Sequence, residues 1–156
     1  MADSMRWRYG ETNPVLLPVD ADTEIEIGDL VYLDTDDAKP ASMLAESTKA
    51  ANQEAFHDSF AGVAMQRSRA GDTTAIRIAT SGVFEFDCAS ATFEVGALLG
   101  PDQPTGDTAL TDQQLASVGA ENLAVGRCAK RVNPAGTQVL VDVVSTVVYG
   151  GPQAKA

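Results

Sequence analysis

The side chains best able to do chemistry in this sequence are carboxylates, and four of them lie close together. Asp20, Asp22, Glu24 and Glu26 occupy alternate positions along one short stretch. Pairs of carboxylates act as acid and base in glycoside hydrolysis, so a hydrolase that uses dispersed carboxylates is one reading. Alternating acids also keep the exposed face of an edge strand soluble. We interpret this cluster as a solvated strand face.

The other common catalytic signatures are missing from the sequence. There is no G-x-G-x-x-G or G-x-x-x-x-G-K-[ST] loop, whose glycines expose backbone N–H groups to a phosphate. His57 is the single histidine, and no serine lies in a G-x-S-x-G elbow that it could serve as a base. We interpret His57 as a polar position on a helix. The sequence therefore predicts a protein that is not an enzyme, with no catalytic residues and no cofactor.

Metal sites are not predicted either. Asp34-Thr35-Asp36-Asp37 superficially resembles a calcium loop, but Lys39 stands where that loop needs its glycine, so an acidic turn is the simpler interpretation. Cys88 and Cys128 lie far apart in apolar, strand-like surroundings, which predicts buried free thiols. A zinc site needs more ligands than these two cysteines and His57 readily supply.

A cluster of arginine and aromatic residues near the N-terminus is the best candidate for binding. It consists of Arg6, Trp7, Arg8 and Tyr9, and contains the single tryptophan. Trp7 and Tyr9 would fit a core as well as a contact surface. Arginine, tryptophan and tyrosine are, however, enriched at the centres of interfaces. We therefore predict that these four residues contact a partner or a second subunit.

The composition indicates an acidic, β-rich globular protein. Hydrophobic residues make up 44% and charged residues 21% of the 156 residues, which is enough to form a core. The 13 glycines and 7 prolines interrupt short runs rich in Val, Ile and Thr. With 22 acidic and 11 basic residues the formal charge is −11, so we expect no nucleic-acid and no membrane partner. The opening residues lack the apolar stretch of a signal peptide, and we expect synthesis in the cytoplasm.

The chain divides into three segments. Residues 1–22 form an extended N-terminal arm, because Pro14 and Pro18 disfavour a helix. Residues 23–150 form a β domain, and residues 151–156 a flexible tail. We expect the domain to fold without the arm, which would carry attachment to a partner.

Within the β domain, alternating apolar residues predict strands, and one short helix is predicted over residues 47–60. Residues 107–122 fit either a short helix or a loop. A pattern also recurs roughly 64 to 68 residues further along the chain. Glu26-Ile27-Gly28-Asp29-Leu30 matches Glu94-Val95-Gly96-Ala97-Leu98, and Gly62-Val63-Ala64-Met65-Gln66-Arg67 matches Gly126-Arg127-Cys128-Ala129-Lys130-Arg131. The low identity also allows a chance similarity of glycine-broken strands. We interpret the pattern as two related β units, at about residues 23–90 and 91–150.

The order and spacing of several short glycine-anchored motifs resemble the cement, or head decoration, proteins of tailed bacteriophages. The motifs are Tyr9-Gly10-Glu11-Thr12, Ile27-Gly28-Asp29-Leu30-Val31, Phe60-Ala61-Gly62-Val63-Ala64, Ala70-Gly71-Asp72 and Thr80-Ser81-Gly82-Val83-Phe84-Glu85-Phe86. The resemblance implies a mainly β, compact β-barrel-like domain without an active site. It also implies a homotrimer that binds the major capsid protein on the outer surface of the virion and stabilises the head. The alternative is a carbohydrate-binding or other ligand-binding β module.

Overall fold

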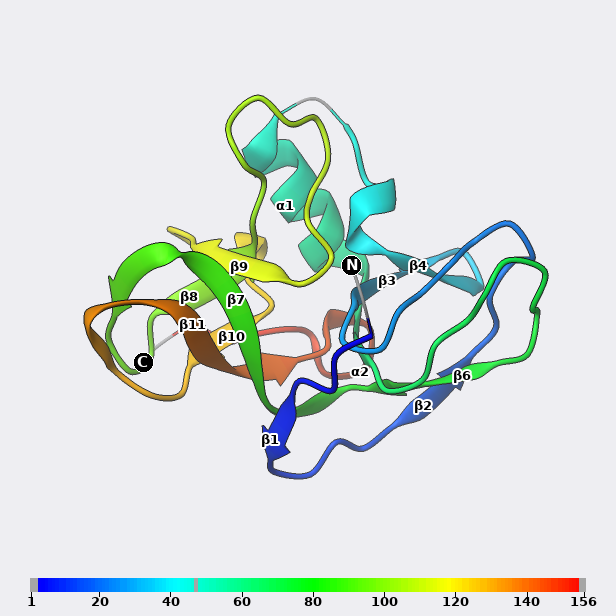
Figure 1. The fold of residues 1–156 in the computed structure, drawn as a ribbon, viewed down its shortest axis with the longest axis horizontal. Coiled ribbons are helices and arrows are strands. Elements are labelled where there is room, and N and C mark those ends of the chain that lie inside the picture. Colours follow the sequence, from blue (N-terminus) through cyan, green and yellow to red (C-terminus); the bar gives the residue numbers. More distant parts are fainter. Residues whose placement is uncertain (1–2, 47, 155–156) are drawn as a thin grey trace.

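The computed structural model describes residues 3–46 and 48–154 and is mainly β, as predicted, with 42% strand and 14% helix (Figure 1). Of the described elements, only α1 is a helix of seven or more residues. The strands are β1 (Trp7–Tyr9), β2 (Val15–Leu17), β3 (Leu30–Asp34), β4 (Asp37–Pro40), β5 (Phe60–Ala64), β6 (Ile76–Ala79), β7 (Ser81–Phe93), β8 (Leu98–Pro101), β9 (Gln114–Ser117), β10 (Gly126–Cys128) and β11 (Val132–Val144). The helical segments are η1 (Ala41–Met43), α1 (Lys49–Ser59), η2 (Glu121–Leu123) and α2 (Thr146–Tyr149).

The strands form two sheets with the same order. Unit 1, residues 15–79, has the order β2-β6-β5-β3-β4, and unit 2, residues 81–144, has the order β7-β11-β10-β8-β9. A parallel pairing of β7 with β9 closes unit 2 into a five-strand barrel, seen on the left of Figure 1. At the corresponding place in unit 1, the N–H of Ala38 donates to the carbonyl oxygen of Pro18 at 2.9 Å. Strand β1 adds to the other edge of β7.

The predicted repeat corresponds to matching hydrogen bonds in the two units. Gly28 donates its N–H to the oxygen of Ala64 at 2.9 Å, and Gly96 donates to Cys128 at the same distance. Both glycines have a positive φ, 96° and 92°, which favours glycine at the turn before β3 and before β8. The strands after these turns pair in equivalent registers in the two units. Leu30 lies opposite Val63 in unit 1, and Leu98 lies opposite Arg127 in unit 2. The prediction of two related β units is therefore confirmed.

A second pair of matched glycines permits close packing of neighbouring strands. A Cβ atom on Gly62 would lie 1.9 Å from the oxygen of Ala79, and one on Gly126 would lie 2.2 Å from the oxygen of Asp142. No side chain fits at such distances. Glycine at these positions therefore lets β5 approach β6, and β10 approach β11, more closely than any other residue would.

The structure places the boundaries differently from the sequence pattern. The sheets divide the chain at Thr80, between β6 and β7, rather than at about residue 90. Residues 3–20 contain no helix and lead into a turn at residues 21–22, and they are not separate from the β domain, because they supply β1 and β2 to the two sheets. The tail begins with the buried Gly151 and Pro152, and Arg127 donates to the oxygen of Gln153. Residues 1–2 and 155–156 lie outside the described residues.

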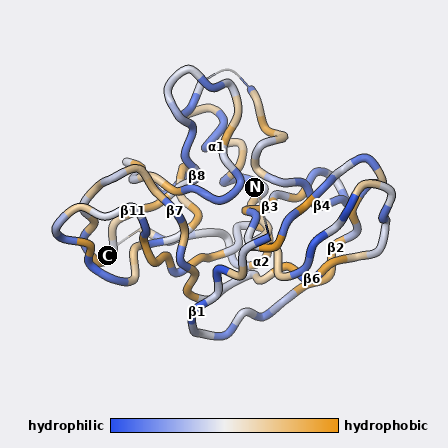
Figure 2. The backbone as a smooth tube through the Cα atoms, in the orientation of Figure 1, coloured by the Kyte–Doolittle hydropathy of each residue, from blue (hydrophilic) through white to orange (hydrophobic). Residues whose placement is uncertain are grey.

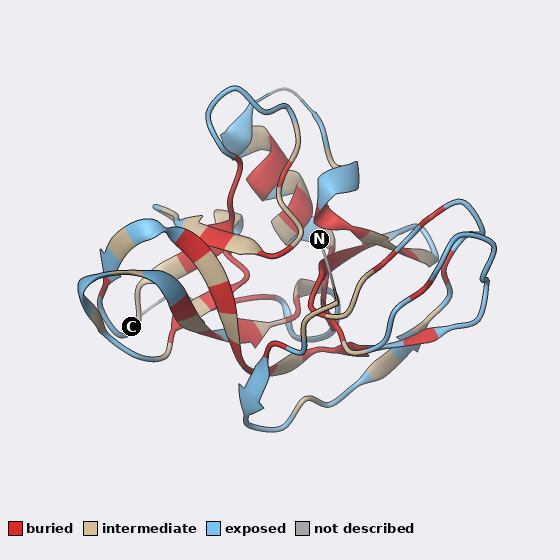
Figure 3. Ribbon diagram, viewed as in Figure 1, coloured by how far each residue is buried: buried red, intermediate tan, exposed pale blue. Residues whose placement is uncertain are grey.

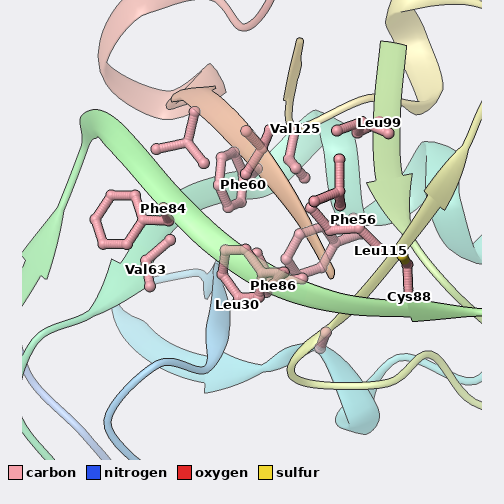
Figure 4. Close-up of a cluster of buried hydrophobic side chains, with 14 of the residues drawn as sticks. Leu30, Phe56, Phe60, Val63, Phe84, Phe86, Cys88, Leu99, Leu115 and Val125 are labelled. Atoms are coloured by element: carbon pink, nitrogen blue, oxygen red, sulfur yellow. The ribbon is translucent and has the colours of Figure 1, made fainter. Parts of the chain in front are cut away.

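The helix and the largest apolar cluster lie where the two units meet. Helix α1 begins after Thr48, whose Oγ1 accepts the N–H of Ala51; Ser47, the predicted start, lies outside the described residues. Phe56 of α1 packs with Phe60 at a ring distance of 5.4 Å. The buried cluster joins side chains of unit 1 to side chains of unit 2, including Leu30, Val63, Phe84, Phe86, Leu99 and Leu115 (Figure 4). Each large apolar side chain buried here contributes roughly 2 kcal/mol, so the cluster holds the units together.

Candidate interaction surface

The N-terminal segment, residues 3–18, is held by both units. Strand β1 pairs with β7, with Trp7 opposite Phe84, and β2 pairs with β6, with Leu16 opposite Arg77. Between these strands the N–H of Thr80 donates to the oxygen of Thr12 at 2.9 Å. In Figure 1 the segment runs from the N-terminal label through β1 to β2. The backbone of the segment is therefore fixed by the sheets.

Arg6, unlike the other three predicted contact residues, is buried in this chain. Only 8% of the residue is exposed. Its Nε and Nη2 donate to Oε1 of Gln113 at 3.2 and 2.9 Å, and Nη2 also donates to Oδ2 of Asp87 at 3.2 Å. The guanidinium lies 5.8 Å from the centre of the Phe86 ring. Arg6 anchors the segment because a buried guanidinium needs these partners.

Gln113 connects Arg6 to a buried carboxylate of unit 1. Its Nε2 donates to Oδ1 of Asp29 at 2.8 Å and to the oxygen of Ile27 at 3.2 Å. Asp29 also accepts the N–H of Glu26. Burial raises the pKa of Asp29 to about 6, although the hydrogen bonds from Gln113 and Glu26 oppose this shift. Gln113 thus joins the N-terminal segment, unit 1 and unit 2 in one polar network.

Asp3 and Ser4 fix the start of the segment to the turn at residues 26–29. Asp3 accepts the N–H of Ile27 at 2.9 Å and pairs with Arg67 at 2.7 Å, and the N–H of Ser4 donates to the oxygen of Ile27 at 2.8 Å. The side-chain hydrogen bond with Glu26, followed by the bond from Ile27, lowers the pKa of Asp3 to about 2. The same contact raises the pKa of Glu26. The turn is therefore covered by the chain itself.

The other three predicted contact residues lie on the surface. Trp7 is 40% exposed and Tyr9 is 53% exposed, and β1 is drawn as exposed along its length in Figure 3. The indole Nε1 of Trp7 donates to the oxygen of Gly10 at 3.0 Å, which holds the ring against the loop that follows. Arg8 is exposed and pairs with Glu85 at 3.1 Å. Trp7, Arg8 and Tyr9 are thus available to a partner.

A groove of about 560 Å³ lies beside Trp7. It is lined by Trp7, Gly10, Glu11, Thr12, Asn13, Pro14 and Met65. Met65 follows β5 and donates its N–H to the oxygen of Arg77, which in turn lies opposite Leu16. Leu16 is 63% exposed, and Arg77 is exposed beside it. Strands β2 and β6 carry hydrophobic residues, whereas the peripheral loops are largely hydrophilic (Figure 2). We call Trp7, Tyr9, Leu16 and Met65 the N-terminal surface.

Two members of the N-terminal surface were not predicted from the sequence. Leu16 lies between Val15 and Leu17, and strand alternation would have placed it on the outer face if these three residues had been recognised as a strand. No local pattern points to Met65. Its position beside Trp7 depends on how the N-terminal segment crosses unit 1.

Among the other residues considered for catalysis or metal binding, His57, Asp34 and the two cysteines are paired or buried within the fold. Nδ1 of His57 lies 2.9 Å from the oxygen of Ala124. Asp34 pairs with Lys39 across the turn between β3 and β4 at 2.9 Å. Cys88 and Cys128 are buried free thiols, as predicted, and burial raises the pKa of both. Among the described residues no three His, Cys, Asp or Glu side chains are grouped as a metal site would need.

None of the described helices is long and apolar enough to cross a membrane.

Neither a comparison with protein-family models nor one with curated proteins gives a match to this chain.

Proposed function

We propose that this chain is a capsid decoration protein of a tailed bacteriophage. In this proposal it binds the major capsid protein on the outer surface of the head, stabilises contacts between capsid subunits, and acts as a binding module without catalysis. The resemblance of its glycine-anchored motifs supports the proposal. The observation that carries it is the N-terminal surface, in which Trp7, Tyr9 and Leu16 are exposed on a rigidly held segment and the half-buried Met65 of unit 1 lies beside Trp7.

Exposed side chains of this kind are typical of the centre of a protein interface. Single exposed apolar residues are common on any surface. Here, however, Trp7 and Met65 line one groove. Leu16 lies opposite Arg77, which is hydrogen-bonded to Met65, and so extends the apolar surface beyond the groove. Tryptophan and tyrosine supply large contact areas and lose little side-chain entropy on binding. The backbone that carries them is already paired in both sheets, so little ordering is required when a partner docks.

The proposal includes a homotrimer on the capsid. A single domain of this size makes few contacts with a shell, whereas a closed ring of three copies makes each contact three times and raises the effective concentration of the next. The formal charge of −11 favours basic patches on the capsid protein and makes free copies repel one another at low salt.

The direct test is co-sedimentation with expanded heads assembled from the major capsid protein of a tailed bacteriophage. Trp7→Ala combined with Tyr9→Ala should lower occupancy at least about thirtyfold, as expected for aromatic residues at an interface centre. The matched control is Tyr149→Ala, which truncates an aromatic residue that is 45% exposed on α2. Circular dichroism should show all variants folded. Wild-type occupancy of the double variant would contradict the proposed surface, and absence of wild-type binding would contradict the function.

The groove itself supports a second candidate, a carbohydrate-binding module. Trp7 offers a ring face for a sugar, and Glu11 and Asn13 line the same groove with polar groups. Quenching of Trp7 fluorescence by a panel of soluble glycans tests this function, because Trp7 is the single tryptophan. Saturable quenching by one glycan class, with no binding to heads, would favour this candidate over the capsid.

A further inference from the structure

The turn at residues 94–97 of unit 2 is the structural counterpart of the turn at residues 26–29 of unit 1. In each turn the N–H of the fourth residue donates to the oxygen of the first at 3.1 Å. The glycine at the third position has φ 96° in one turn and 92° in the other. Strands β3 and β8, which follow the two turns, pair in the same register with the equivalent strands β5 and β10. The two turns therefore present their second residues, Ile27 and Val95, in the same way.

In unit 1 this turn is a binding site that the chain itself occupies. The carboxylate of Asp3 accepts the N–H of Ile27 and pairs with Arg67, and the N–H of Ser4 donates to the oxygen of Ile27. Gly28 is needed for the approach, since a Cβ there would lie 2.3 Å from the oxygen of Ser4. The bound segment is thus an extended dipeptide with an acidic first residue.

In unit 2 the same surface is uncovered. Val95 is 65% exposed, and within the described part of the chain its N–H and carbonyl oxygen form no hydrogen bond. Arg131 stands at the position that Arg67 holds in unit 1, and its side chain is 60% exposed. Its Nε contacts Glu94, and its two Nη atoms have no partner among residues 3–46 and 48–154. An ion pair this exposed contributes little to stability.

Arg131, which contacts Glu94 of this turn, also lines a cleft of about 210 Å³. Lys130, Val132 and Leu140 are among its other lining residues, and so is the acidic Glu85. Glu94 and Glu85 balance the charges of Arg131 and Lys130 here. What Arg131 offers a carboxylate is therefore its two Nη groups, which can form charge-assisted hydrogen bonds.

We propose that the turn at residues 94–97, together with Arg131, binds an extended acidic segment of a partner polypeptide. A carboxylate of the partner accepts the N–H of Val95 and a bond from Nη of Arg131, and the next N–H of the partner donates to the oxygen of Val95. The occupant is recognised by the same chemistry as Asp3 and Ser4 at the turn of unit 1. This inference does not depend on the capsid proposal, because it rests only on the matched turns.

Glu94 sets the strength of this site. It occupies the position of Glu26, which lies beside Asp3 in unit 1 and whose pKa is raised by that contact. A carboxylate that binds at unit 2 therefore meets like charge from Glu94 and competes with it for Arg131. Glu94→Gln removes the repulsion and should tighten binding several-fold.

The test uses the full chain, labelled with ¹⁵N, and the acetylated and amidated peptide Ala-Asp-Ser-Met, which copies residues 2–5. Titration into the millimolar range should shift the amide signals of Val95 and Gly96 with saturation. Replacing the aspartate of the peptide by asparagine, or Arg131→Ala in the protein, should weaken binding about tenfold, as expected for the loss of one charge-assisted hydrogen bond. Arg69→Ala, at an exposed arginine of unit 1, is the matched control and should change nothing.

Three results would overturn the inference. The first is the absence of shifts at Val95 and Gly96 up to the highest peptide concentration. The second is a set of shifts confined to Ile27 and Gly28, which would mean that the peptide only displaces the chain's own segment. The third is the same set of shifts with inorganic phosphate at equal concentration, which would identify a general anion site. The Glu94→Gln variant gives an independent check, since weaker binding would contradict the assigned geometry.

Discussion

Replacing Gln113 by leucine tests whether the polar network holds the N-terminal segment and the two units together. The substitution removes two hydrogen bonds from Arg6, the bond to Asp29 and the bond to the oxygen of Ile27, and both charged partners are buried. Arg6 keeps Asp87, and Asp29 keeps the N–H of Glu26. A hydrogen bond to a charged group contributes about 1.5–3 kcal/mol, and the partial compensation leaves an expected loss of about 3–5 kcal/mol. The melting temperature should fall by about 10 °C.

The pH dependence of this loss separates a charge effect from a packing effect. The Gln113 hydrogen bond lowers the pKa of Asp29, so in the variant burial raises this pKa further above about 6. A carboxyl group whose pKa is raised by folding stabilises the fold below its unfolded pKa, and this contribution is lost as pH rises through the folded pKa. The loss caused by Gln113→Leu should therefore be larger near neutral pH than at about pH 4. Urea unfolding at the two pH values measures it.

The control is Gln114→Leu, at the neighbouring half-buried position in β9. Among the described residues its side chain makes no hydrogen bond to Arg6, Gln113 or Asp29, so its replacement should change the free energy of unfolding by less than about 1 kcal/mol. An equal loss for Gln113→Leu at both pH values would refute the reasoning for Asp29, because the charge of this carboxylate would then contribute nothing to the loss.

Three further predictions concern the fold. Asp29→Asn removes the charge but also one of the two oxygens that accept from Gln113 and Glu26, so the variant should be less stable than wild type at about pH 4; the difference should shift in favour of the variant by up to about 3 kcal/mol as pH rises to about 7, measured by urea unfolding, and a pH-independent difference would contradict the pKa of about 6. Gly126→Ala places a Cβ 2.2 Å from a carbonyl oxygen of β11 and should cost more than about 3 kcal/mol, whereas Gly119→Ala, in open space, should be nearly neutral in thermal melts. Cys88 and Cys128 should react with a disulfide reagent only as fast as the protein opens, so rapid labelling of the native state would show that they are not buried.

The two β units could be predicted because their signals are local. A glycine with positive φ before a strand leaves a pattern within five residues, and the matches at Gly28 and Gly96 found the equivalent turns. The order of the strands was not predictable in this way. Closure of unit 2 depends on a parallel pairing of Asp87 with Gln114 and Cys88 with Leu115, and no short pattern encodes such a contact.

The candidate site was predicted only in part, because residue type is a local signal whereas burial depends on distant contacts. Residue type pointed to Trp7, Arg8 and Tyr9, since these side chains are enriched at interfaces. Arg6 is also an arginine next to Trp7, like Arg8. Its partner Gln113, however, is 107 positions away in the sequence. Burial of a charged residue is decided by that distant partner, so residue type alone did not indicate that Arg6 is buried.

The path of the N-terminal segment also sets an order of events during synthesis on the ribosome. All strands of unit 1 lie within residues 15–79 and can pair while the rest of the chain is still being made. Residues 6–9 need β7, Arg6 also needs Gln113, and these partners emerge later. Residues 6–9 are therefore made before unit 1 but reach their final position after it, and Arg6 stays in water until most of unit 2 has left the exit tunnel.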